Sequence, residues 1–135
     1  MLRVVVDVNV FVAALLSPRG VPARIIEGWT DREYQLVVSP LLLAELERVI
    51  RRPKFRRSIR EAEITGLLSA LAEDAELVAD PPSQPGLTAD PDDDYLVALA
   101  RTTGADYIVS GDVHLLELQD PRPPVLPPRS FLERP

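Results

Sequence analysis

Residues 2–9 read Leu2-Arg3-Val4-Val5-Val6-Asp7-Val8-Asn9, a short apolar run that ends in an acid. The β-branched residues of this run favour a strand, and its continuous apolar character is typical of a strand that is buried on both faces. Strands of this kind occur in parallel sheets whose faces are covered by helices. We therefore expect a buried strand over residues 2–6, with Asp7 directly at its carboxyl end.

Apolar runs and helical repeats alternate along the rest of the chain. The pattern predicts further strands at residues 35–38, 76–79 and 106–110, and a short edge strand near Val125. It predicts helices at residues 10–16, 23–31, 41–51, 61–75 and 91–103, and a final turn at 130–133. The proline-rich residues 80–90 are expected to form a loop rather than a domain linker. This order predicts an α/β fold with a central, mostly parallel sheet between helices, and one domain over residues 1–135.

The composition excludes several kinds of site. The 135 residues contain no cysteine and one histidine, His114. A disulfide framework, a zinc ribbon, thiol catalysis and a multi-histidine metal site are therefore excluded. No apolar run approaches the roughly 20 residues that span a bilayer, and Asp7 interrupts any signal-peptide core. We expect a cytoplasmic protein that does not bind a membrane.

Charge is distributed unevenly around a net value of −6. The basic segment, residues 48–60, carries no acid and seven basic residues: Arg48, Arg51, Arg52, Lys54, Arg56, Arg57 and Arg60. The rest of the chain holds 8 basic and 21 acidic residues. A local basic stripe lets an acidic protein bind nucleic acid or an acidic partner. A solvated helix face explains the same charges, and the sequence leaves both interpretations open.

Four acids are expected near one edge of the sheet. Asp7 follows the first strand directly and Asp112 follows the strand at 106–110 by two residues, so both lie at the carboxyl edge. In open α/β sheets, ligands bind beyond the carboxyl ends of the strands. Helices that follow strands begin at this same edge, which places Asp93 in a first helical turn and Glu45 about one and a half turns inside a helix.

Helical spacing distinguishes Asp93 from its acidic neighbours. Asp93 lines up with the apolar stripe that is expected to pack on the sheet. Asp94 lines up with Arg101 and is expected to face solvent, and Asp92 is the second choice for a site residue. Helix capping explains acids in a first turn, but it does not explain an acid on the apolar stripe.

The four acids together predict a cation. Carboxylates in one crevice raise each other's pKa, so they do not all stay ionised unless a cation compensates them. Oxygen ligands without cysteine or a histidine cluster favour a hard divalent ion, Mg²⁺ or Mn²⁺. Such an ion suits phosphodiester hydrolysis, because it neutralises the phosphate and activates water.

Other enzymes with an aspartate after the first strand fit less well. Haloacid-dehalogenase-like phosphatases and response-regulator receiver domains need a lysine at a late strand, whereas the one lysine here, Lys54, lies in the basic segment. The phosphatases also need a second acid where this chain has Asn9. The chain contains no G-x-G-x-x-G, Walker A loop or G-x-S-x-G elbow, so nucleotide binding and a serine triad have no support.

Four sequence motifs carry a resemblance to a known family. They are Val4-Val5-Val6-Asp7-Val8-Asn9, Ser39-Pro40-Leu41-Leu42-Leu43-Ala44-Glu45-Leu46, Asp90-Pro91-Asp92-Asp93-Asp94-Tyr95-Leu96 and Ala105-Asp106-Tyr107-Ile108-Val109-Ser110-Gly111-Asp112. In this order they resemble PIN-domain nucleases, and in particular the VapC-like toxins of toxin–antitoxin pairs. The motifs extend over nearly the whole chain.

The resemblance implies a three-layer α/β/α PIN-like fold and an Mg²⁺- or Mn²⁺-dependent endoribonuclease. Such toxins are often homodimers, and a cognate antitoxin holds them inactive. The metal-binding and catalytic acids would be Asp7, Glu45, Asp93 and Asp112. Asn9 and Ser110 would support these acids by hydrogen bonds.

The basic segment then becomes a candidate surface for RNA or an antitoxin, through Arg48, Arg51, Arg52, Lys54, Arg56 and Arg57. Two alternatives stay open. One is a nuclease of RNA processing or DNA repair that has no antitoxin. The other is a catalytically weak binding module whose acidic crevice docks a basic partner.

Overall fold

Five short strands form one sheet in the order β3-β2-β1-β4-β5, and every neighbouring pair is parallel. They are β1 (Arg3–Val6), β2 (Gln35–Val38), β3 (Glu76–Leu77), β4 (Tyr107–Val109) and β5 (Val125–Leu126). This computed structural model describes residues 1–82, 86–88, 90 and 93–134. The predicted α/β fold is confirmed, and within the described residues the sheet is wholly rather than mostly parallel.

β1 occupies the centre of the sheet. Val4 of β1 pairs with Leu36 of β2 on one side and with Tyr107 of β4 on the other. Val4 and Val5 are fully buried, as expected for a strand with neighbours on both edges and helices on both faces. Asp7 follows β1 and therefore lies at the carboxyl edge of the sheet.

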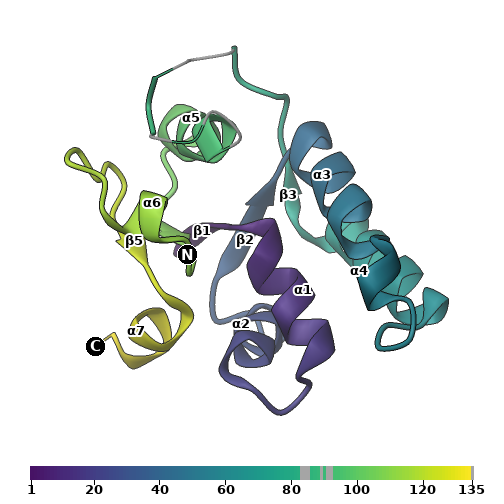
Figure 1. Ribbon diagram of the computed structural model, residues 1–135. Coiled ribbons are helices and arrows are strands. Elements are labelled where there is room, and N and C mark those ends of the chain that lie inside the picture. The colour runs from purple at the N-terminus through teal and green to yellow at the C-terminus, as the bar shows by residue number, and fades with distance from the viewer. Residues whose placement is uncertain (83–85, 89, 91–92, 135) are drawn as a thin grey trace.

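Helices cover both faces of the sheet and flank one end of it. Figure 1 shows α5 (Asp94–Thr103) over one face and α1 (Val8–Leu16), α2 (Val21–Thr30) and α7 (Pro128–Glu133) over the other. α3 (Pro40–Ile50) and α4 (Glu61–Asp74) lie at the β3 end (Figure 1). Within the part of the chain that the structure describes, no helix is long and apolar enough to cross a membrane.

Two short elements were not predicted from the sequence. They are α6 (Val113–Leu116) and the 3₁₀ helix η1 (Pro53–Phe55), which are too short to show a hydrophobic repeat. The start of α1 also differs from the prediction. It lies at Val8 because the side chain of Asp7 accepts a hydrogen bond from the backbone nitrogen of Asn9 and caps the helix.

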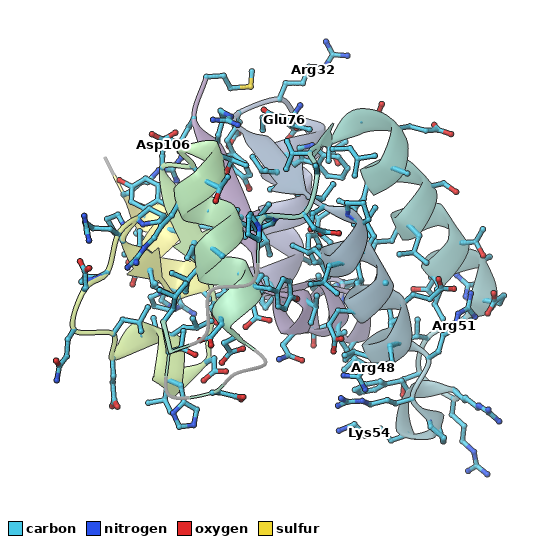
Figure 2. All side chains as sticks on the ribbon, turned by 90° about the horizontal axis from the view of Figure 1, so that it is seen from above. Arg32, Arg48, Arg51, Lys54, Glu76 and Asp106 are labelled. Atoms are coloured by element: carbon cyan, nitrogen blue, oxygen red, sulfur yellow. The ribbon has the colours of Figure 1, made fainter. Side chains whose placement is uncertain are left out.

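The amino edge of the sheet is tied together by Arg3. Its guanidinium donates hydrogen bonds to Glu76 at the start of β3, and its backbone nitrogen donates to Asp106 at 2.8 Å. Figure 2 shows Glu76 and Asp106 at this edge, together with Arg32. The acids Glu76 and Asp106 therefore have structural partners at the amino edge.

Candidate active site

Asp7 is held by two hydrogen bonds at the carboxyl end of β1. The residue is 3% exposed. Its Oδ1 accepts from the backbone nitrogen of Asn9 at 3.2 Å, and its Oδ2 accepts from the Ser110 hydroxyl at 2.8 Å. Burial raises the pKa of Asp7, the hydrogen bonds from Ser110 and Asn9 lower it in part, and the charge of Asp112 raises it.

Ser110 joins the ends of β1 and β4. It is fully buried, and its Oγ accepts a hydrogen bond from the backbone nitrogen of Asp112 at 2.9 Å while donating to Asp7. Asp112 in turn caps α6, because its Oδ1 accepts from the backbone nitrogen of His114 at 2.8 Å. One hydroxyl therefore fixes the relative position of Asp7 and Asp112.

Asn9 supports the site differently from Ser110. Its backbone nitrogen holds Asp7, but its side chain is exposed and makes no hydrogen bond with any residue that the structure describes. The expected support of the acids by Asn9 thus comes from the main chain in this structure, and its amide is free for another partner.

Asp93 lies next to these acids, directly before α5. It is 9% exposed, and its Oδ2 is buried without a hydrogen-bond partner among the described residues. Burial raises the pKa of Asp93 to about 8, with further contributions from contact with Asp112 and from the charges of Asp7 and Asp90. A bound cation would stabilise the ionised form of Asp93, which burial and the neighbouring negative charges disfavour.

The prediction that Asp94 faces solvent is wrong. Asp94 is 8% exposed, and its carboxylate accepts hydrogen bonds from the backbone nitrogens of Gly86 and Thr88 and from the Thr88 hydroxyl. The loop before α5 folds over the helix start and covers the side that helical spacing had assigned to solvent. Asp94 therefore anchors the loop. Asp92, the second choice, lies outside the described residues.

Glu45 forms its ion pair within its own helix. It lies on α3, half-buried, and its carboxylate forms an ion pair with Arg48, in which Arg48 Nε donates to Oε2 at 3.3 Å and Nη2 donates to Oε1. The spacing of Glu45 and Arg48, three residues apart on one helix, was the sequence signal that could have predicted this pair.

Tyr95 of α5 is affected by the charges of Glu45 and of two of the other acids. Burial is the main cause that raises the pKa of its hydroxyl, and the charges of Asp7, Glu45 and Asp93 raise it further. One phenol therefore lies within electrostatic range of acids from β1, α3 and the start of α5. The sequence analysis did not single out Tyr95, although it stands two residues after Asp93.

The donor set is suited to a hard divalent ion, but the ligands do not surround one position. Within the described residues, no three His, Cys, Asp or Glu side chains are arranged to hold a metal ion. The carboxylate oxygens and the unpartnered Oδ2 of Asp93 match the chemistry of Mg²⁺ or Mn²⁺. Asp7, Asp93 and Asp112 are close enough to change one another's pKa values. Glu45 would have to break its ion pair with Arg48 to bind an ion together with them.

The basic segment divides into paired and unpaired residues. Three of its members form ion pairs with acids: Arg48 with Glu45, Arg51 with Glu47 and Glu61, and Arg60 with Glu63. Four others are exposed and have no ion pair within the described residues: Arg52, Lys54, Arg56 and Arg57. Figure 2 shows Arg48, Arg51 and Lys54 at the end of the molecule opposite the amino edge.

Comparisons with known proteins bear on the family and the fold of this chain. A family model described as PIN domain matches residues 3–114. The uncharacterized protein MJ1680 of Methanocaldococcus jannaschii is 29% identical over 120 residues, which cover 88% of this chain and 76% of that protein. A chain in the crystal structure of VapBC2 from Rickettsia felis bound to a DNA fragment from their promoter has the same fold, with a TM-score of 0.61 and 14% identity over 87% of this chain and 94% of that chain.

Proposed function

This chain belongs to the PIN domain family of nucleases, and from this premise we propose that it is a metal-dependent endoribonuclease that hydrolyses RNA phosphodiester bonds. The observation that carries the proposal is the buried Oδ2 of Asp93. This oxygen has no hydrogen-bond partner in the described residues, and its carboxyl group lies beside Asp7 and Asp112. A divalent cation bound by these acids would supply the partner that this oxygen lacks.

In the proposed site, Asp7, Asp93 and Asp112 hold Mg²⁺ or Mn²⁺, and Glu45 completes the set after it separates from Arg48. When bound, the ion would neutralise the scissile phosphate and make water a better nucleophile at neutral pH. Ser110 keeps Asp7 and Asp112 in register, and the backbone nitrogen of Asn9 orients the second oxygen of Asp7.

The unpaired residues of the basic segment are proposed to track the RNA backbone. Arg52, Lys54, Arg56 and Arg57 are exposed cations without an acidic partner in the described chain, so they can neutralise phosphates without first breaking an ion pair. Arg48 and Arg51 would add to this surface only by exchanging Glu45, Glu47 or Glu61 for a phosphate.

We further propose that the protein is the toxin of a toxin–antitoxin pair, that it forms a homodimer and that a cognate antitoxin restrains it. The structural likeness to a chain of the VapBC2 complex supports this role at the level of the fold. The role predicts that expression of the wild-type protein arrests growth. Expression of an Asp93→Asn variant should not, because an amide is nearly isosteric but is a weaker, neutral ligand.

The test of the nuclease is cleavage of structured RNA with Mn²⁺ and with EDTA. Wild-type protein should cleave only with the ion, and Asp7→Asn and Asp93→Asn should not cleave. The matched control is Asp31→Asn, which removes an exposed acid at the end of α2.

A binding measurement that needs no substrate accompanies the cleavage assay. Mn²⁺ at about 100 times its Kd should stabilise the wild-type fold by about 2.7 kcal/mol, and Asp7→Asn should lose most of this gain. RNA that stays intact under all conditions would favour the alternative of a catalytically weak module that binds a basic partner.

A further inference from the structure

We propose that a cavity beside Asp7 and Asp112 is the binding site for one nucleobase of the RNA substrate, next to the phosphate that is cleaved. The inference rests on the proposed nuclease function and adds a specificity site to it. The cavity measures about 500 Å³, within the range of sites that bind small molecules. Asp7 and Asp112 form part of its wall, so a group bound there touches the proposed metal ligands.

The remaining wall of the cavity is mostly apolar. It is built by side chains from three helices, namely Val10 and Ala13 of α1, Pro22 of α2 and Pro128 of α7. Apolar side chains of this kind can pack against the face of an aromatic ring. No basic side chain lines the cavity, and its two charged groups are acids, so an anionic group has no partner in it other than a metal ion held by those acids. The cavity therefore disfavours a free anion, whereas a neutral ring such as a nucleobase can pack against its apolar wall.

One polar side chain of the cavity is available to read such a group. The Asn9 amide lines the cavity, is exposed and makes no hydrogen bond within the described residues. An amide offers one acceptor and two donor hydrogens, which matches the mixed donor and acceptor edge of a nucleobase. The same residue holds Asp7 through its backbone nitrogen, which links base recognition to the position of a proposed metal ligand.

The far wall of the cavity is fixed in place. Pro128 begins α7, and α7 is anchored by Phe131, which is fully buried and packs edge-on against Tyr34 with ring centroids 5.0 Å apart. At Gly111, which also lines the cavity next to Asp112 in the sequence, an added Cβ would meet no atom within 4 Å, so the cavity is open beside this acid. A base in the cavity would thus leave its phosphate at this open side, next to Asp7 and Asp112.

Pro128 and α7 lie outside residues 3–114, the part of the chain that matches the family model. A base preference that depends on Pro128 would therefore be set in part by residues outside the region that matches the family model.

The test measures binding of the four nucleoside 5′-monophosphates and of ribose 5-phosphate to the whole protein by calorimetry, with Mg²⁺ present. Ribose 5-phosphate carries the same sugar and phosphate without a base. At least one nucleotide should bind about tenfold more tightly than ribose 5-phosphate, because only the base buries apolar surface against the cavity wall. Ala13→Leu, which fills the cavity from a helical position, should abolish this difference.

Ala72→Leu is the matched control, since it adds the same bulk to an exposed position of α4 and should keep the difference. Asn9→Ala is a second variant that leaves the apolar wall intact and should reduce the preference among the four bases while ribose 5-phosphate binds as before. Wild-type protein that binds all five compounds equally would overturn the inference, as would an undiminished preference in both Ala13→Leu and Asn9→Ala.

The nuclease proposal and the base site fail separately. RNA cleavage with Mn²⁺ by a protein that shows no base-dependent binding overturns the base site and leaves the nuclease standing. Base-dependent binding that Ala13→Leu abolishes supports the site even if the cleavage assay is negative. Equal binding of all five compounds would indicate that the cavity does not bind a base and would favour a protein partner as its occupant.

Discussion

The hydroxyl of Ser110 lies 2.8 Å from Oδ2 of Asp7, although the two residues are 103 positions apart in the sequence. The Ser110 hydroxyl oxygen also accepts a hydrogen bond from the backbone nitrogen of Asp112 at 2.9 Å. The buried side chain of Ser110 therefore connects Asp7, which follows β1, with Asp112, which follows β4. The distance between Asp7 and Asp112 therefore depends on a group that carries no charge and is not a proposed metal ligand.

Replacement of Ser110 by alanine should lower the stability of the protein by about 1–3 kcal/mol, because it leaves buried polar groups of Asp7 and Asp112 without a partner. Urea unfolding measures this loss. Ser58→Ala, at an exposed position, is the control and should change stability little. Calorimetry should also show weaker Mn²⁺ binding for Ser110→Ala and wild-type binding for Ser58→Ala. Unchanged Mn²⁺ affinity would contradict a role for Ser110 in holding the acids in register.

Asp93→Asn should stabilise the metal-free protein in a pH-dependent way. Its pKa is raised to about 8 in the folded state, compared with about 4 in an unfolded chain, so the folded state binds more protons. The resulting destabilisation is absent below pH 4, grows as the pH rises to 8 and is complete above it. The difference in unfolding free energy between Asp93→Asn and wild type should therefore be larger at pH 8.5 than at pH 5. Urea unfolding in EDTA at these two pH values measures it, and an equal difference at both would refute the raised pKa.

Asp94→Asn should destabilise the protein, in contrast to Asp93→Asn. The carboxylate of Asp94 accepts three hydrogen bonds from Gly86 and Thr88, so an amide at this position should lower stability by about 1–3 kcal/mol. The stabilisation that Mn²⁺ gives should stay close to that of wild type, because Asp94 is engaged by the loop. Melting curves with and without Mn²⁺ check both statements. If Asp94→Asn lost the stabilisation by Mn²⁺ and Asp93→Asn kept it, Asp94 would be the metal ligand and Asp93 would not.

The salt dependence of RNA binding should separate the unpaired from the paired residues of the basic segment. Arg52→Gln and Arg56→Gln should each reduce the slope of log affinity against log salt by about 0.7 to 1, the effect of one lost phosphate contact. Arg51→Gln should change the slope less, because Arg51 already pairs with Glu47 and Glu61.

Arg32→Gln is the control for this series, since it removes one charge at the amino edge, opposite the basic segment (Figure 2). Titrations of a fluorescent RNA at several salt concentrations give the slopes. If the slopes of Arg52→Gln and Arg56→Gln equal that of wild type, the basic segment is not part of the RNA interface.

The sequence by itself determined the order of the elements and the position of two acids. A β-branched apolar run followed by Asp7 predicts a central strand that ends in an acid, because burial on both faces requires such a run. The same local argument placed Asp112 at the end of β4. These predictions depend on residues that are neighbours in the sequence, and the structure agrees with them.

The tertiary structure decided how the side chains are partnered. Asp94 is buried because a loop from before α5 donates hydrogen bonds to it, and helical spacing contains no information about a loop that covers the helix. The cavity beside Asp7 exists because α7 meets α1 and α2 there, although α7 lies about 100 residues further along the chain. Local patterns fix where the backbone turns and which face is apolar, whereas contacts between distant segments fix which polar groups remain free to bind.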